Sequence, residues 1–283
     1  MSRSGTTLLS CVLDAHPSIA AGAELIPTDI PDLTQLRDVV EKALEESADF
    51  SETGRYIRRN IDKAMGSNVV RCYRAGATAS DLLETIDQFL DSGLRSVTSF
   101  EDRFSFAVAI IERRRQREGK RFGSFKLNTP TLLPVLETYP AAFVVCLVRH
   151  PADVVHSHIK NNFGKPAAQI CKAWLRYLRS FESACDQFGD RVAVIKYEDF
   201  VAEPEEVLAS IFDLLPIDMD ARMLNYQEAD SRILNSRHPN TDTLRRGIVT
   251  DAVGVSTRQN DTTISTAVTR NCRAQMRAWG YMS

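Results

Sequence analysis

Two continuous apolar runs limit the possible folds of this 283-residue chain more than any other feature of its sequence. They are AFVVCLV at 142–148 and VAVIKY at 192–197. Strands that are apolar throughout are typical of a parallel sheet covered on both faces. Helical patterns at 152–161 and 167–188 supply the crossover that two parallel strands require. The sequence therefore predicts an α/β fold, with a parallel sheet flanked by helices.

The rest of the chain fits the same class. A third short strand is expected at 122–127, before a helix at 131–138. Further helical patterns occur at 32–64, 80–90, 100–117 and 263–279. No internal repeat, low-complexity tract or linker interrupts the pattern, so we expect a single domain over residues 1–283.

Composition excludes several classes of partner. The net charge of −2 predicts no general attraction to a nucleic acid polymer or an anionic membrane. The six cysteines include no C-x-x-C pair, which favours buried free thiols in a reducing compartment. There is no run of 18 apolar residues and no signal-peptide pattern. We therefore expect a cytoplasmic protein that does not contact membranes.

The segment RSGTT at 3–7 has the composition of a loop that binds an anion at the start of a helix. Gly5 lets the backbone approach a ligand, Ser4, Thr6 and Thr7 add hydroxyl groups, and Arg3 adds a charged fork. A nucleoside triphosphatase loop would place Gly-Lys before the hydroxyl residue, whereas here Thr6 follows Gly5 directly. We also find no aspartate at the end of an apolar strand to hold magnesium. An ordinary helix start is the simpler alternative.

A second candidate anion site lies in the segment VRHPADVVHS at 148–157. Arg149 follows the apolar strand, at the edge where open α/β sheets bind ligands. Pro151 is suited to the first turn of the next helix, and Ser157 lies about two turns into it. Arg149 and Ser157 can therefore hold a second phosphate, although an arginine at a strand end is often structural.

A strongly basic run occupies residues 112–121, with the sequence ERRRQREGKR. Its simplest interpretation is a solvated end of the helix expected at 100–117. The alternative is a positively charged edge that attracts an acidic substrate.

The two anion-binding segments together resemble those of the sulfotransferases that use 3′-phosphoadenosine 5′-phosphosulfate (PAPS). The stretch RSGTTLLSCVLDAHPSIAAGAE at 3–24 is especially similar to the tyrosylprotein sulfotransferase branch and its bacterial relatives. SFKLNTP at 124–130, IKYEDFVAEPEEVL at 195–208 and CRAQMRAWGY at 272–281 resemble further motifs of that family, in the same order. The resemblance extends over about residues 1–281.

The resemblance implies PAPS as the donor and PAP, the 3′,5′-bisphosphate, as the product. It implies that the loop of Arg3, Ser4, Gly5, Thr6 and Thr7 holds the 5′-phosphosulfate. Arg149 and Ser157 would hold the 3′-phosphate. The resemblance places Tyr197 near the adenine. LRRG at 244–247 resembles a nucleotide loop of the aryl branch, which makes Arg245 and Arg246 further candidate ligands.

The resemblance also implies the catalytic residues. Glu24 occupies the position of the general base in the tyrosylprotein branch, while Lys126 and Arg3 would stabilise charge on the leaving group. Sulfuryl transfer of this kind requires no metal, and we expect none. The aryl branch uses a histidine as base, but none of His16, His150, His156, His158 and His238 follows its pattern.

Two positions depart from the tyrosylprotein pattern. Asn161 stands where that branch has an arginine for the 3′-phosphate, and Lys160 beside it is a possible substitute. The best match to a C-terminal serine loop, IVTDAVG at 248–254, has Val249 or Thr250 at the serine position. These departures leave the two roles open in this chain.

The expected activity is sulfuryl transfer to an acceptor hydroxyl on a peptide tyrosine, a carbohydrate or a small molecule. Helices between Glu24 and about residue 122 would form the acceptor wall. The alternatives are a P-loop kinase or nucleoside triphosphatase, and a nucleotide-binding relative with impaired catalysis. The strand that precedes the loop in the family is missing from this sequence, so we expect the natural protein to begin upstream. The sequence does not indicate an oligomeric state.

Overall fold

The computed structural model describes residues 3–282, with the exception of 47–48, 128–131, 162–163 and 236–240. The chain divides into two compact units. The first unit comprises Met1–Thr6, Asn128–Met219 and Ile248–Ser283, and the second comprises Thr7–Leu127 and Asp220–Gly247. The expectation of one domain over 1–283 stays a prediction.

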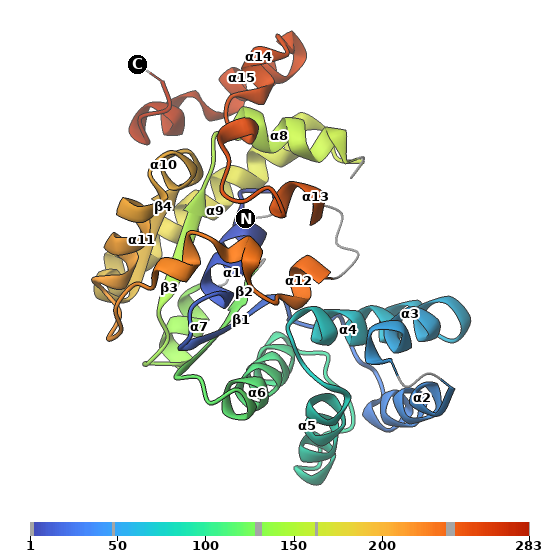
Figure 1. The fold of residues 1–283 in the computed structure, drawn as a ribbon. Helices are drawn as coiled ribbons and strands as arrows, with labels where there is room; N and C mark the ends of the chain where they lie inside the picture. Colours follow the sequence, from blue (N-terminus) through green and yellow to red (C-terminus); the bar gives the residue numbers. More distant parts are fainter. Residues whose placement is uncertain (1–2, 47–48, 128–131, 162–163, 236–240, 283) are drawn as a thin grey trace. The chain divides into compact units, whose positions relative to one another are not determined.

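The first unit contains the two strands that the sequence predicts most firmly. β3 (Val144–Val148) and β4 (Val192–Lys196) pair in parallel, with Val144 opposite Val192 and Val148 opposite Lys196 (Figure 1). Each strand is shorter than its apolar run. Tyr197 does not end the strand, as the run suggests, but begins helix α10 (Tyr197–Ala202). Glu198 and Asp199 in the first turn of α10 favour that start, because acidic groups stabilise a helix N-terminus.

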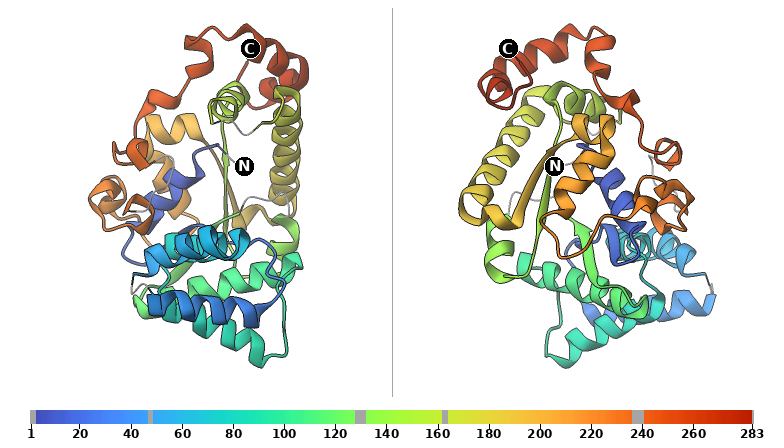
Figure 2. Two further views of the ribbon diagram at one scale, coloured as in Figure 1. Left: turned by 90° about the vertical axis from the view of Figure 1, so that its right-hand side faces the viewer. Right: turned by 60° about the vertical axis from the view of Figure 1, so that its left-hand side comes forward.

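Helices surround this pair of strands. α8 (Pro151–Lys160) and α9 (Ala167–Phe188) form the crossover between β3 and β4, and both pack against α15 (Thr262–Ala278) (Figure 2). These bounds agree with the expected helices to within one residue. The remaining helices of the first unit are α7 (Leu132–Thr138), η1 (Gly189–Arg191), α11 (Pro204–Phe212), η4 (Thr250–Ala252) and α14 (Val255–Arg258).

The second unit contains a separate parallel pair, β1 (Ile19–Glu24) and β2 (Phe122–Lys126). The sequence predicts β2 but not β1, because the segment IAAGAE is poor in the β-branched and aromatic residues that favour strands. Small residues are needed there for packing: a side chain at Gly22 would bring its Cβ within 2.9 Å of the Cβ of Ala75. The strand expected before the opening loop would fall outside the described residues.

Five helices build most of the second unit. α2 (Leu33–Glu46) and α3 (Phe50–Asn60) replace the single helical pattern expected at 32–64, and α4 (Lys63–Arg74) follows them. α5 (Ala79–Asp91) and α6 (Phe100–Arg117) lie where the sequence predicts helices. The other helices are α1 (Thr6–Asp14), η2 (Ala221–Met223), η3 (Tyr226–Glu228), α12 (Arg232–Asn235) and α13 (Thr241–Leu244).

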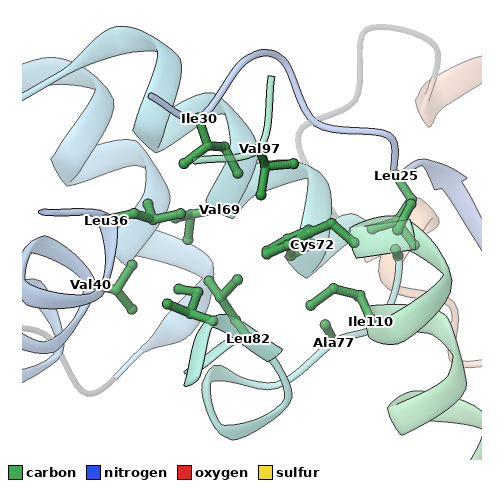
Figure 3. Close-up of a cluster of buried hydrophobic side chains, with 14 of the residues drawn as sticks. Leu25, Ile30, Leu36, Val40, Val69, Cys72, Ala77, Leu82, Val97 and Ile110 are labelled. Atoms are coloured by element: carbon green, nitrogen blue, oxygen red, sulfur yellow. The ribbon is translucent and has the colours of Figure 1, made fainter. Parts of the chain in front are cut away.

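Apolar side chains from these helices form the core of the second unit. Leu36, Val69, Leu82 and Ile110 point toward one another from α2, α4, α5 and α6 (Figure 3). An antiparallel bridge between Ile30 and Val97 closes one side of this cluster. Burial of apolar surface stabilises proteins by about 25 cal/mol per Å², so this cluster holds the helices of the second unit together.

Two further expectations concern composition. All six cysteines are free thiols, and all except Cys185 are buried. Within the described ranges, none of the helices is both long enough and apolar enough to span a bilayer.

Candidate functional site

The backbone of the opening loop turns sharply and lies close against the Tyr197 ring. Arg3 and Gly5 both have positive φ, at 67° and 93°, and α1 begins at Thr6 and continues through Thr7. A Cβ on residue 5 would lie 2.3 Å from an atom of the Tyr197 ring, so only glycine fits there. Ser4 is buried. The loop therefore directs the first backbone N–H groups of α1 toward one point, as an anion site requires.

The two segments predicted to bind phosphate meet in the first unit. The Nε of Arg3 donates a hydrogen bond to the Oγ of Ser157 at 2.9 Å, across 154 residues of sequence. Nη1 of Arg149 donates to the backbone carbonyl of Arg3 at 3.1 Å. The structure therefore brings together the three side chains that sequence reasoning assigned to separate halves of one ligand.

Arg149 is buried but is not neutralised. Its relative exposure is 8%, and its guanidinium lies over the Tyr197 ring at 4.7 Å from the ring centre. Its hydrogen bonds go to the carbonyls of Arg3 and Ala252, and its Nε is buried without a hydrogen-bond partner. No carboxylate of the described residues forms an ion pair with it. A buried cation with an unused donor is a site that an anion would complete.

Electrostatics at Arg3 point the same way. Burial and then the charge of Arg149 lower the pKa of Arg3. Two guanidinium groups that repel each other are stabilised by an anion that lies within reach of both. We refer to Arg3, Gly5, Arg149, Ser157 and Tyr197 together as the Arg149 cluster.

Sequence reasoning missed a carboxylate that supports this cluster. Asp153 is buried in α8 and accepts hydrogen bonds from the backbone of Gly254 at 2.7 Å and of Ser256 at 3.0 Å. It thereby fixes the loop whose Ala252 carbonyl receives Arg149. Thr250, a candidate for the missing serine role, begins η4 in the same loop. The only signal in the sequence was an aspartate four residues after Arg149.

The predicted catalytic pair lies in the second unit. Glu24 and Lys126 are opposite each other in the β1–β2 register, and Lys126 Nζ lies 2.8 Å from Glu24 Oε1. The Lys126 side chain is 7% exposed, whereas that of Glu24 is 43% exposed. The carboxylate is therefore fixed by a buried ammonium and is still reachable by a substrate hydroxyl.

Arg74, which sequence reasoning did not single out, is a further charge close to Glu24. Burial, followed by the charges of Arg58 and Arg55, lowers the pKa of Arg74, and the charge of Glu24 opposes that shift. Arg74 lies at the end of α4, which packs against β1. It adds positive charge on the Glu24 side of this strand.

The basic run at 112–121 is neither a simple solvated end nor an exposed positive edge. Arg114 is buried and pairs with Asp14 at 2.7 Å and with Glu118 at 2.8 Å. Two neighbours on the helix are also paired, Arg113 with Glu84 and Arg117 with Asp81. Charge in this run is therefore largely neutralised within the second unit.

The other predicted groups have local roles in the structure. Arg245 and Arg246 are exposed in the second unit, and Arg245 donates to the carbonyl of Leu234 at 3.0 Å. Their role as nucleotide ligands stays a prediction. The Nδ1 of His16 accepts from the backbone of Ser18, and that of His150 accepts from Ala152. His238 lies outside the described residues. Across the described ranges, no group of three or more histidine, cysteine or acidic side chains is arranged to hold a metal.

Comparisons with known proteins give a consistent result. A family model described as "Sulfotransferase family" matches residues 1–221. The protein-tyrosine sulfotransferase of Drosophila melanogaster is 25% identical over 80% of this chain and 38% of its own length. Protein-tyrosine sulfotransferase 1 of Danio rerio is 23% identical over 80% of this chain and 54% of its own length. The chain thus spans about half or less of these relatives.

Solved structures agree on the fold. The sulfotransferase domain of the Synechococcus PCC 7002 olefin synthase has a TM-score of 0.57 at 20% identity, over 94% of this chain and 90% of that one. The sulfotransferase domain of the curacin biosynthetic pathway has a TM-score of 0.57 at 17% identity, over 95% and 94%. The fold is therefore the P-loop-like α/β fold of sulfotransferase domains.

Proposed function

Because the chain belongs to the sulfotransferase family, we propose that it transfers a sulfuryl group from PAPS to a hydroxyl group of an acceptor. The observation that carries this proposal is the Arg149 cluster. Two family-like segments meet there through the hydrogen bond between Arg3 and Ser157. They leave a buried guanidinium with no carboxylate partner in the described part of the chain.

The residues present fit a donor with two separated phosphate groups. The unpartnered Nε of Arg149 and the hydroxyl of Ser157 suit a 3′-phosphate, which offers several strong acceptors. The turn at Gly5 and the start of α1 suit the 5′ group, because backbone N–H groups and a helix N-terminus favour an anion. Ser4, Thr6 and Thr7 would contribute there. Tyr197 would lie near the base.

When bound, PAPS supplies a sulfuryl group already activated as a mixed phosphate–sulfate anhydride. The roles left to this chain are proton removal and charge stabilisation. Glu24 would accept the proton of the acceptor hydroxyl, because its side chain is 43% exposed and is held by Lys126 at 2.8 Å. Lys126 and Arg3 would stabilise negative charge on the departing bisphosphate. The acceptor oxygen gains the bond to sulfur as the bond between sulfur and the bridging oxygen breaks.

A kinase or nucleoside triphosphatase function has less support. The loop lacks the Gly-Lys pair that would reach the β- and γ-phosphates of ATP. A nucleotide-binding relative without transferase activity would keep the Arg149 cluster and lose turnover. Turnover, and not nucleotide binding, therefore distinguishes an active transferase from an inactive nucleotide-binding relative.

The test is incubation of the chain with PAPS and one acceptor at a time, with chromatographic detection of PAP. The acceptors are a tyrosine peptide, a phenol and an oligosaccharide, with the tyrosine peptide first because two relatives are named protein-tyrosine sulfotransferases. A parallel arm replaces PAPS with ATP and Mg²⁺. We expect acceptor-dependent PAP release and no ADP. PAP binding without turnover on any acceptor would contradict transfer and favour the inactive relative, and ADP release would favour a kinase.

A further inference from the structure

A group of residues outside the predicted site holds the turn that carries Arg149. The carboxylate of Glu198 accepts two hydrogen bonds, one on each oxygen. Its Oε1 receives the backbone N–H of His150 at 2.8 Å, and its Oε2 receives the hydroxyl of Tyr281 at 3.0 Å. One carboxylate in the first turn of α10 therefore links the end of β3 to the segment that follows α15.

Tyr281 is fixed in place by several contacts. Its ring meets the His150 ring edge-on, with centres 5.2 Å apart at 88°, and the Lys196 ammonium lies over it at 5.3 Å. Gly280 has a φ of 68°, which allows the chain to turn sharply after α15. The indole N–H of Trp279 donates to Glu182 of α9 at 3.1 Å. Burial and the Glu198 charge raise the pKa of Tyr281, so its hydroxyl stays a donor.

The turn is held from its other side as well. The indole N–H of Trp174 donates to the backbone carbonyl of Arg149 at 2.9 Å. Trp174 therefore fixes the carbonyl and Glu198 fixes the next N–H, which together fix the peptide plane between Arg149 and His150. The hydrogen bonds of Glu198 go to His150 and Tyr281, whereas those of the Arg149 guanidinium go to the carbonyls of Arg3 and Ala252. Glu198 and Tyr281 therefore act on the backbone of the turn and not on the charged group.

We propose that Tyr281 and Glu198 form a latch that positions the Arg149 turn and thereby sets the affinity of the chain for the 3′-phosphate of its nucleotide. Both are positioning residues, since neither is placed at the ligand itself. The inference rests on the proposed function, because it assumes that Arg149 binds a 3′-phosphate. It predicts that a change more than 130 positions from Arg149 in sequence affects one phosphate of the ligand selectively.

The test compares two nucleotides that differ only in that phosphate. Calorimetry measures the affinities of wild type and Tyr281→Phe for adenosine 3′,5′-bisphosphate and for adenosine 5′-phosphate. Loss of one hydrogen bond to a charged acceptor should weaken bisphosphate binding by about 3- to 30-fold. Binding of the 5′-phosphate should be unchanged. Tyr56→Phe is the matched control, since this tyrosine lies on α3 in the second unit and is 36% exposed.

A second pair of variants keeps the inference testable if Tyr281→Phe does not fold. Glu198→Gln can accept from His150 and donate to Tyr281, so it should retain the affinity for the bisphosphate. Glu198→Met has neither capacity and should lose affinity to a similar degree as Tyr281→Phe. In the Arg149→Ala background, Tyr281→Phe should have no further effect, because the two residues act through one contact.

The possible failures are distinct. If the wild type discriminates the bisphosphate from the 5′-phosphate but Tyr281→Phe and Glu198→Met bind both like wild type, the latch is wrong and the proposed function stands. An equal loss of affinity for both nucleotides would also overturn the latch, because it would indicate general destabilisation. If wild type binds neither nucleotide, the proposed function itself fails.

Discussion

Two arginines, one in each unit, are buried to nearly the same degree and have opposite surroundings. Arg114 in the second unit is 6% exposed, and Arg149 in the first is 8% exposed. Arg114 has the carboxylates of Asp14 and Glu118 and the carbonyls of Ala21 and Ala75. Arg149 has carbonyls and an aromatic ring, and one donor without a partner. Burial alone therefore does not distinguish a structural arginine from a binding one.

The difference lies in where the compensating charge comes from. Burial opposes the charge of Arg114, but Asp14 and Glu118 outweigh it and raise the pKa of Arg114. Its charge is thus balanced within the fold, and it joins α1, β1 and the end of α4. Arg149, by contrast, forms no ion pair with a carboxylate of the described residues, and its charge helps to lower the pKa of Arg3. A fold that leaves such charge uncompensated is stabilised by an external anion.

The largest expected effect is on stability. Replacing Arg114 by methionine leaves Asp14 buried without its partner, which should reduce the free energy of unfolding by about 3–5 kcal/mol. Replacing Arg149 by methionine in the ligand-free protein should cost less, about 1.5 kcal/mol, because hydrogen bonds to carbonyls and the contact with the Tyr197 ring are lost but repulsion with Arg3 is relieved. Urea unfolding followed by circular dichroism measures both. Equal losses would mean that the two arginines are both structural.

The next effect concerns the ion pair between Glu24 and Lys126, in which the lysine is buried and the glutamate is 43% exposed. Glu24→Gln should reduce kcat by about 10²- to 10⁴-fold, since the amide cannot accept the acceptor proton, while affinity for PAP is retained. Glu84→Gln is the control, because Glu84 is likewise a partly exposed glutamate that pairs with a basic residue of the second unit, Arg113. Steady-state kinetics with PAPS would decide. Turnover near wild type in Glu24→Gln would remove Glu24 as the base and direct attention to the histidines.

The smallest effect is at the edge of the Arg149 cluster. Ser157→Ala removes the acceptor of the Arg3 Nε hydrogen bond and one hydroxyl donor to the ligand, so PAP affinity should fall by about 2- to 12-fold. Ser210→Ala serves for comparison, because the exposed hydroxyl of Ser210 donates to the Val207 carbonyl of its own helix. Calorimetric affinities that are the same for the two variants would remove Ser157 from the binding site.

The features that the sequence predicted are those with a local pattern or a family motif. The apolar runs predicted β3 and β4, and Arg149 directly follows β3, as expected. The family resemblance selected Arg3 with Ser157 and Glu24 with Lys126, and each pair is hydrogen-bonded in the structure. These pairs join distant segments, so periodicity alone would not have found them.

The features that escaped prediction depend on long-range packing. β1 is rich in alanine and glycine because Ala75, at the end of α4, approaches it closely at Gly22. Such small residues do not favour strands, so the sequence did not predict β1. Arg114 reads as a solvated residue because its neighbours are charged, and only the fold brings Asp14 to it. Glu198 and Tyr281 meet across 83 residues, and no local pattern indicates that contact.

The proposed 3′-phosphate site at Arg149 is tested most directly by a calorimetric titration of PAP into wild type and Arg149→Ala, with adenosine 5′-phosphate as the reference ligand. We expect Arg149→Ala to weaken PAP binding by about 1.5–3 kcal/mol, or roughly 10- to 150-fold, since a charge-assisted contact to the 3′-phosphate is lost. The affinity for the 5′-phosphate should not change. Unchanged PAP affinity in Arg149→Ala would show that this arginine does not bind the 3′-phosphate.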